Sequence, residues 1–378
     1  MLLSNLKWGI IATAAVAVSA PAFAQCTPPA TTNGPDVIVG DIPNTVANYT
    51  NVGAIDAFSV GTTSCNIGNV WLNWIAGTNQ HPAISQSMYK LKVLADGSSR
   101  FEMVGQSWLK HGFFALSNNL CCNNCSATDG THLGVHCADP YTASRNGGQS
   151  DAGPKWQINA ATGVFTYPPA NPSFSGTVAR RLQVKAEDLE VSSTTVKYFV
   201  EAQYVTNDDA ANGNKNNNAS YRQMLMAGSG SAWTMSSTGT TQRTMQGVRA
   251  WEANATGVNV KDVSIANDGL ILLAHQVKDI GGGQWHYEYV VQNMNSDRAV
   301  GGMSLPVPAG VNLTNIAFND VDYHSGDGPG NVNFSGTDWA NSVGGGAISW
   351  STEAFATNPN ANAIRWATAY TFRFDANT

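Results

Sequence analysis

Charged residues are scarce in this chain. Asp, Glu, Lys and Arg together make up 12% of the 378 residues, and the net charge is −6. The sequence contains no basic run, so neither nucleic acid nor an anionic membrane surface is expected as a partner. Lys, Glu and Leu are also too few for a mainly helical fold, which leaves β structure as the alternative.

The sequence also lacks the short motifs that mark several common enzyme chemistries. It contains no G-x-S-x-G, no G-x-x-x-x-G-K-[ST] and no H-E-x-x-H. These absences argue against an α/β-hydrolase serine, a P-loop nucleotide site and a helical zinc-protease site. Any catalytic or binding site must therefore be found from other residues.

The first 24 residues have the pattern of a signal peptide. Lys7 precedes the apolar run "GIIATAAVAVSA", and "AFA" forms a small-residue cleavage site before Gln25. The run is short for a membrane span, and no second long apolar run follows it. We therefore expect a mature chain without a membrane span, exported to the periplasm or the extracellular medium.

What the chain does contain is typical of an all-β protein. Short β-branched and aromatic runs alternate with clusters of Gly, Asn and Ser. The pattern predicts antiparallel β-sandwiches in two domains. We expect a β-rich N-terminal domain with a Cys-rich loop over 25–245, and an immunoglobulin-like sandwich over 246–378. Near this boundary, "MQGVRAWEAN" predicts one short helix.

The six cysteines all lie in the first 40% of the chain. They are Cys26, Cys65, Cys121, Cys122, Cys125 and Cys137. In an exported chain they predict up to three disulfides, for which fifteen connectivities are possible. The alternative is a zinc site formed by Cys122-x-x-Cys125 and His132-x3-His136, although the gap between these pairs is shorter than usual.

Three segments carry a resemblance to known proteins. They are "RFEMVGQSWLKHGF", "CADPY" and "NANAIRWATAYTFRFDAN". In these segments the chain resembles exported bacterial β-rich proteins to which no activity is assigned. The resemblance implies export and a β-rich fold, and it implies no catalytic or binding residue.

Two of the seven histidines flank a glycine-rich turn in "ILLAHQVKDIGGGQWHYEYVV", residues 271–291. In either of two simple hairpin registers, His275, His286 and Glu288 lie on one face of the sheet, because side chains alternate along a strand. A bulge at the glycines would separate them. His324, at the end of a later strand, is the third predicted ligand of a copper or zinc ion. The alternative is a pair of ordinary polar residues on a sheet face.

A second group of histidines belongs to the N-terminal half. If the cysteines are oxidised, His111, His132 and His136, together with His81, are free to form another metal site, with Asp139 as an orienting partner. Residues 207–214, "NDDAANGN", offer clustered oxygen ligands of the kind calcium prefers, without the spacing of an EF-hand. In both places, ordinary loop residues are the alternative.

These patterns support three hypotheses about function. The leading one is an exported metal-binding β-sandwich protein, with copper-dependent oxidoreductase activity suggested by fold-level analogy to two-sandwich copper monooxygenases. The second is a non-catalytic surface-assembly or glycan-binding protein that uses some of the tryptophans Trp71, Trp74, Trp108, Trp339, Trp350 and Trp366. The third is an extracellular polymer hydrolase with a carboxylate pair drawn from Glu102, Asp139, Glu201 and Glu288. The sequence leaves the substrate and the oligomeric state open.

Overall fold

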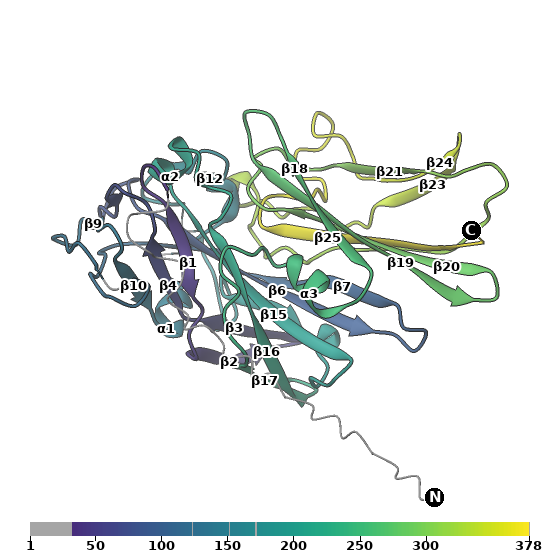
Figure 1. The fold of residues 1–378 in the computed structure, drawn as a ribbon, viewed down its shortest axis with the longest axis horizontal. Coiled ribbons are helices and arrows are strands. Elements are labelled where there is room, and N and C mark those ends of the chain that lie inside the picture. The colour runs from purple at the N-terminus through teal and green to yellow at the C-terminus, as the bar shows by residue number, and fades with distance from the viewer. Residues whose placement is uncertain (1–31, 123, 151, 171, 378) are drawn as a thin grey trace, which may run out of the picture.

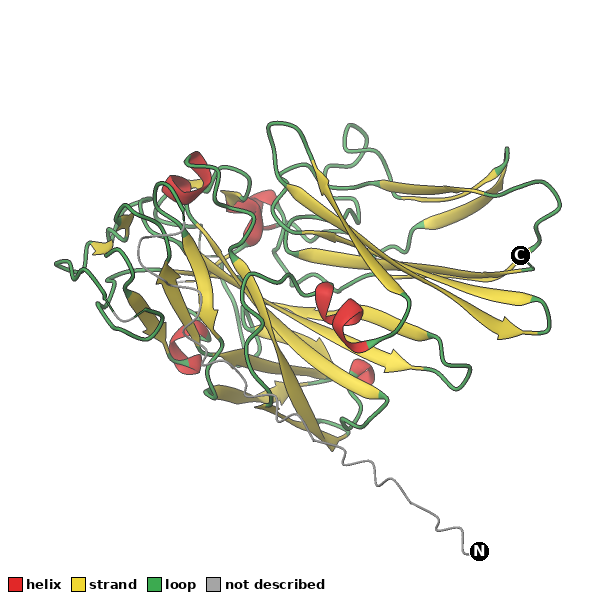
Figure 2. Cartoon of the chain, in the orientation of Figure 1, coloured by secondary structure: helices red, strands yellow, loops and turns green. Residues whose placement is uncertain are grey.

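A computed structural model describes residues 32–122, 124–150, 152–170 and 172–377. Strands dominate this part of the chain, and every pairing between its named strands is antiparallel (Figure 2). The predicted all-β fold class is therefore confirmed. The predicted signal peptide, residues 1–24, and Cys26 lie outside the described residues.

The largest sheet is formed by strands of the N-terminal half. Its main path runs β17-β16-β15-β6-β7-β14-β3-β2, with β8 and β11 attached at the side. The strands are β2 (Val46–Val52), β3 (Ile55–Val60), β6 (Ala83–Val93), β7 (Ser99–Gln106), β8 (Leu109–His111), β11 (Ala152–Gly153), β14 (Leu182–Lys185), β15 (Val196–Val205), β16 (Ala219–Ser229) and β17 (Ala232–Ser237). The sheet rolls until its two edges meet, and the Asn48 amide bonds both the N–H and the C=O of Met235. The predicted turn at 95–99 joins β6 to β7.

Shorter elements accompany this rolled sheet, and those near the N-terminus share an apolar core with its strands. Three strands form a small sheet in the order β1-β4-β10: β1 (Val37–Asp41), β4 (Thr62–Asn66) and β10 (Ala138–Tyr141). Two strand pairs are β5 (Leu72–Asn73) with β9 (His132–Leu133), and β12 (Ile158–Asn159) with β13 (Val164–Phe165). The helical turns are α1 (Ala143–Asn146), α2 (Asn207–Ala211), α3 (Arg249–Asn254), η1 (Lys155–Gln157), η2 (Ala186–Asp188) and η3 (Pro329–Asn331). The segment predicted as a short helix contains α3.

The C-terminal part is a sandwich of two sheets. One has the order β18-β19-β20-β25-β22 and the other β21-β24-β23. Their strands are β18 (Val258–Ser264), β19 (Leu270–Gly281), β20 (Gln284–Asn293), β21 (Gly302–Pro306), β22 (Leu313–Asn319), β23 (Ala340–Gly344), β24 (Ala347–Ser351) and β25 (Thr368–Ala376). Trp350 of the smaller sheet packs on Phe372 of the larger one, with ring centroids 5.4 Å apart.

The five-stranded sheet is the middle of three layers (Figure 1). One face packs on the smaller C-terminal sheet, and the other packs on the β6–β7 side of the rolled sheet. Phe101 of β7 and Trp251 of α3 stack at the second contact, 6.1 Å between centroids. The strands up to Ser237 belong to the N-terminal sheets, and those from Val258 onward belong to the two C-terminal sheets. One apolar core nevertheless contains residues from both parts. The domain boundary at 245/246 stays a prediction.

Strands β7 and β25 face each other across this contact, which we call the seam. The Thr371 hydroxyl donates to the Phe101 carbonyl over 2.9 Å, and Arg373 contacts Glu102 over 3.3 Å. One end of the seam lies at Ser99 and Asp375, and the other lies at Gln106 and Thr368. The two ends carry different chemistry, and both bear on function.

Candidate functional site

The hairpin histidines do not share a face of the sheet, so that prediction was wrong. His275 pairs with Tyr289, whereas His286 pairs with Lys278. A register shift between Asp279 and Gly281 places one extra residue in β19. Because side chains alternate along a strand, this single bulge turns His275 to the face opposite His286. His275 instead stacks on the Tyr289 ring, with centroids 5.9 Å apart.

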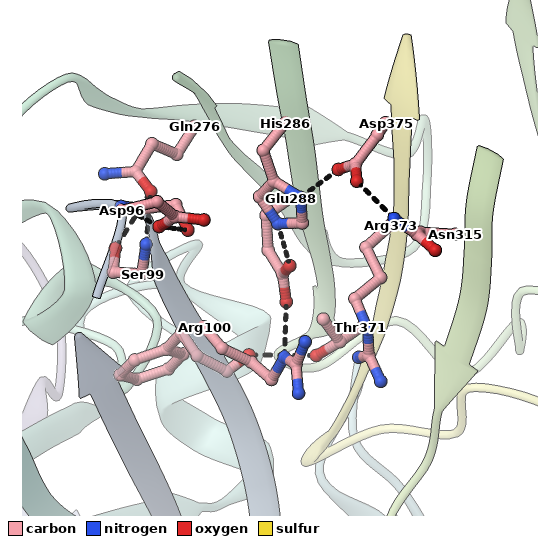
Figure 3. Close-up of polar contacts among 12 residues, drawn as sticks. Asp96, Ser99, Arg100, Gln276, His286, Glu288, Asn315, Thr371, Arg373 and Asp375 are labelled. Atoms are coloured by element: carbon pink, nitrogen blue, oxygen red, sulfur yellow. Dashed lines mark hydrogen bonds and ion pairs between the residues drawn. The ribbon is translucent and has the colours of Figure 1, made fainter. Parts of the chain in front are cut away.

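His286 lies at the Ser99 end of the seam, between two carboxylates (Figure 3). Its Nδ1 lies 2.6 Å from Asp375 Oδ1, and its Nε2 lies 2.9 Å from Glu288 Oε2. Asp375 also accepts a bond from the Asn315 amide, 2.6 Å away. Glu288 is 0% exposed, and its second oxygen lies 3.7 Å from Arg100 of β7 (Figure 3). The chain of contacts therefore crosses from the C-terminal sheet to the rolled sheet.

This geometry favours a protonated imidazole. Burial opposes protonation of His286, but the bonds to Glu288 and Asp375 outweigh it and raise the pKa of His286. Burial also raises the pKa of Glu288. Its contacts with His286, Arg373 and Arg100 act in the opposite direction and lower that pKa in part. Both ring nitrogens of His286 are engaged by carboxylates, so the ring has no lone pair directed at a metal ion. The cluster links the five-stranded sheet to the rolled sheet.

The third predicted ligand, His324, lies at the other end of the seam. Its Nε2 donates to the Gln106 carbonyl over 2.7 Å, and its backbone N–H donates to Asp327 over 2.6 Å. Burial lowers the pKa of His324, so the neutral ring is favoured there. His324 is therefore part of the wall around Gln106 and is separated from the hairpin pair.

The N-terminal histidines are brought together only in part. His81 and His111 are buried neighbours, with Nε2 of His81 3.0 Å from Nδ1 of His111. His132 bonds the Thr131 hydroxyl over 2.9 Å, and His136 is buried in the loop before Cys137 with a φ of 62°. Over the described ranges, no group of three or more His, Cys, Asp or Glu side chains is placed to hold a metal ion. Copper or zinc binding stays a prediction.

Two disulfides join pairs of described cysteines in the N-terminal half. They join Cys65 to Cys121 and Cys125 to Cys137, and none of the described cysteines is a free thiol. The predicted alternative of a zinc site with Cys122 and Cys125 needs their thiolates, and neither residue is a free thiol. Disulfides form in oxidising compartments, in agreement with the predicted export.

The predicted calcium segment uses its carboxylates for the fold. Asp209 is buried and accepts bonds from the Val37 N–H and the Asn218 amide. Asp208 accepts a bond from the Asn73 N–H, 2.7 Å away. These oxygens hold α2 against β1 and β5, and calcium binding here stays a prediction.

The Gln106 end of the seam opens into a cavity of about 800 Å³. Its walls come from the turn between β7 and β8, from η1, from the segments around η3, and from the loops that follow β20 and β24 and precede β25. Six aromatic side chains line it: Trp108, Trp156, Tyr323, Phe334, Phe355 and Trp366. Cavities whose walls combine aromatic and other apolar side chains with polar groups are typical of small-molecule sites, and we call this one the aromatic cavity.

The floor of the aromatic cavity combines indoles with buried polar groups. Trp108 and Trp366 are buried, and their indole N–H groups donate to Asp327 and to the Lys155 carbonyl. Asp327 also accepts the His324 N–H. Burial raises the pKa of Asp327, against the opposing effect of these donors. The indole donors are therefore satisfied by protein, and what they offer a ligand is their ring surface.

Lys155 is the cation of the floor. Its Nζ donates to Gln106 Oε1 over 2.9 Å and to the Ala367 carbonyl over 3.3 Å. Burial of this amine lowers the pKa of Lys155 to about 8. Both acceptors are neutral and the side chain is only partly buried; among the described residues no carboxylate forms an ion pair with this amine.

The rim of the cavity is open to solvent. Trp156 is 38% exposed and Phe355 is 79% exposed. Arg298 and Glu353 are exposed beside them, while the Arg365 guanidinium lies 3.5 Å from the centre of the Phe334 ring. Large exposed aromatic rings beside a cavity mark a surface that a ligand can cover.

Sequence reasoning found only part of this cavity. Among the tryptophans predicted as a sugar platform, Trp108 and Trp366 line it. Trp74, Trp339 and Trp350 are buried in the core and Trp71 is exposed elsewhere. None of the predicted hydrolase carboxylates, Glu102, Asp139, Glu201 and Glu288, lines it, and a polymer hydrolase stays a prediction. The cavity's own carboxylates, Asp297, Asp327 and Glu353, come from loops without a recognisable motif.

Comparison with protein-family models, with curated proteins and with solved structures found no match. No helix among the described residues is long and apolar enough to cross a membrane. Function must therefore be argued from the geometry of the aromatic cavity and its surroundings.

Proposed function

We propose that this chain is an exported binding protein that takes up a neutral carbohydrate in the aromatic cavity. The observation that carries the proposal is the set of six aromatic side chains around a space of about 800 Å³. Sugar rings present flat C–H faces that pack on aromatic rings, and hydroxyl groups that bond nearby polar atoms. The volume is in the range of sites that hold small ligands.

The charges of the lining favour a neutral ligand. Three cationic side chains, Lys155, Arg298 and Arg365, are matched by three acidic ones, Asp297, Asp327 and Glu353. A cavity with balanced charge gains little from an ionic ligand, but it provides donors and acceptors for hydroxyl groups. The proposed ligand is therefore an uncharged saccharide.

Binding of saccharides to the purified mature protein tests this proposal. Affinity electrophoresis in gels that contain neutral polysaccharides, followed by calorimetric titration with oligosaccharides, measures the affinity. Trp156→Ala and Phe355→Ala remove exposed rim rings, so the fold should tolerate them. Loss of one stacking contact of about 1.4 kcal/mol weakens binding about tenfold.

Trp285→Ala is the matched control, because Trp285 is also 38% exposed but lies on β20 outside the cavity. Its affinity should equal that of the unmodified protein. The proposal fails if no neutral saccharide binds, or if Trp156→Ala and Trp285→Ala bind equally well.

A further inference from the structure

Lys155 differs from three lysines of the rolled sheet, Lys90, Lys92 and Lys185, in what its amine contacts. Lys90 and Lys92 lie 2.5 Å and 2.9 Å from Glu190, and Lys185 lies 2.9 Å from Asp322. In the part of the chain that the structure describes, the Lys155 amine has no carboxylate within ion-pair distance and bonds two neutral oxygens. A partly buried ammonium without a counter-ion loses some of its hydration, and loss of its proton relieves that cost.

The surroundings of Lys155 suit a nucleophilic amine. Trp108, Trp156 and Trp366 line the same cavity and keep its walls apolar. Burial lowers the pKa of Lys155 to about 8, so about a tenth of the amine is unprotonated at pH 7, far more than for an ordinary lysine. A lysine desolvated in an apolar pocket is the setting in which proteins form Schiff bases with carbonyl compounds.

We infer that Lys155 captures an aldehyde ligand in the aromatic cavity as an imine. The lone pair of the unprotonated Nζ attacks the carbonyl carbon, so that a C–N bond forms as the C=O π bond breaks, and one proton passes from nitrogen to oxygen to give a carbinolamine. The hydroxyl group then leaves with the second nitrogen proton as water, and a C=N bond remains. No oxidant or reductant takes part, and hydrolysis releases the ligand unchanged.

Asp327 is placed to help this exchange of protons. Asp327 is one of the residues that line the same cavity, and its charge acts on Lys155. Burial raises the pKa of Asp327, so its protonated form is more populated than that of a surface aspartate. An aldehyde with an aromatic or sugar-like body fits the aromatic walls and presents its carbonyl to the floor.

Reductive trapping tests this inference on the mature protein. The protein is incubated at pH 7 with benzaldehyde and cyanoborohydride, and the labelled lysine is identified by peptide mass spectrometry. At this pH an amine with a pKa near 8 has about 10% free base, against roughly 0.04% for an ordinary lysine of pKa 10.4. Lys155 should therefore be labelled on the order of 100-fold faster than a surface lysine.

Lys215 supplies a matched control. Its Nζ also bonds two carbonyl oxygens, those of Ala161 and Asp268, but it lies outside the aromatic cavity. Lys215→Met should keep the fast label, and Lys155→Met should lose it. Peptide mapping of the unmodified protein decides the question even if Lys155→Met fails to fold.

Label spread over exposed lysines, with Lys155 not enriched, would overturn the inference. Because the probe carries no saccharide, a failure of saccharide binding does not affect this test. Conversely, saccharide binding without trapping at Lys155 would leave the proposed function standing and remove the imine.

Discussion

Replacing His286 by leucine removes the centre of the charged cluster that closes the seam. The side chain is 8% exposed and makes two bonds to carboxylates, of 2.6 and 2.9 Å. Hydrogen bonds to charged groups contribute about 1.5–3 kcal/mol each. Removing one partner of a buried pair costs about 3–5 kcal/mol, because the other charge stays buried. Glu288 then keeps the charges of Arg373 and of Arg100, the latter 3.7 Å away, without a hydrogen-bond donor in place of His286, so we expect a loss of about 3–5 kcal/mol.

Guanidinium unfolding at pH 6, followed by tryptophan fluorescence with the disulfides intact, measures this loss. A variant with both His286→Leu and Glu288→Leu should be more stable than His286→Leu alone, because the unpaired buried carboxylate is gone. His275→Leu is the control, since His275 lies on the opposite face and contacts Tyr289. A cost below about 1 kcal/mol for His286→Leu, or a double variant less stable than the single one, would refute the reasoning.

Two further predictions use the same unfolding measurement. Because its bonds raise the pKa of His286 in the folded state, its contribution is complete below the unfolded pKa of about 6.5 and is lost as the pH rises through the folded pKa. The difference in stability between the unmodified protein and His286→Leu should therefore shrink above pH 6.5, and a constant difference would contradict this. The disulfides close loops with sequence separations of 56 and 12 residues. Loop entropy predicts a loss of about 4 kcal/mol for Cys65→Ala with Cys121→Ala, and about 3 kcal/mol for Cys125→Ala with Cys137→Ala. A larger loss for the shorter loop would show that loop entropy is not the main effect.

The fold class could be predicted because it depends on local signals. Short β-branched runs between turn residues gave the strands, and the segment 95–99 gave the turn between β6 and β7. The short helix at Arg249–Asn254 was also predicted from its own residues. Each of these features is set within about ten residues, so a single sequence is enough to find it.

The hairpin histidines show where local reasoning stops. The three glycines Gly281, Gly282 and Gly283 all have positive φ, a conformation that glycine adopts at little cost. They permit several turn geometries, and the register that forms includes a bulge at Ile280. Both simple registers place His275 and His286 on the same face of the sheet. The one extra residue in β19 places them on opposite faces.

The aromatic cavity was harder still to predict, because its walls come from segments far apart in the chain. Trp108 and Trp366 lie 258 positions apart in the sequence and meet only when β7 and β25 face each other across the seam. At the Ser99 end, long charged side chains fill the seam and link the two sheets. At the Gln106 end, indole rings and Lys155, whose amine bonds neutral oxygens, surround the aromatic cavity. The same packing of two sheets thus explains both a closed, charged end that holds the layers together and an open, aromatic end that can accept a ligand.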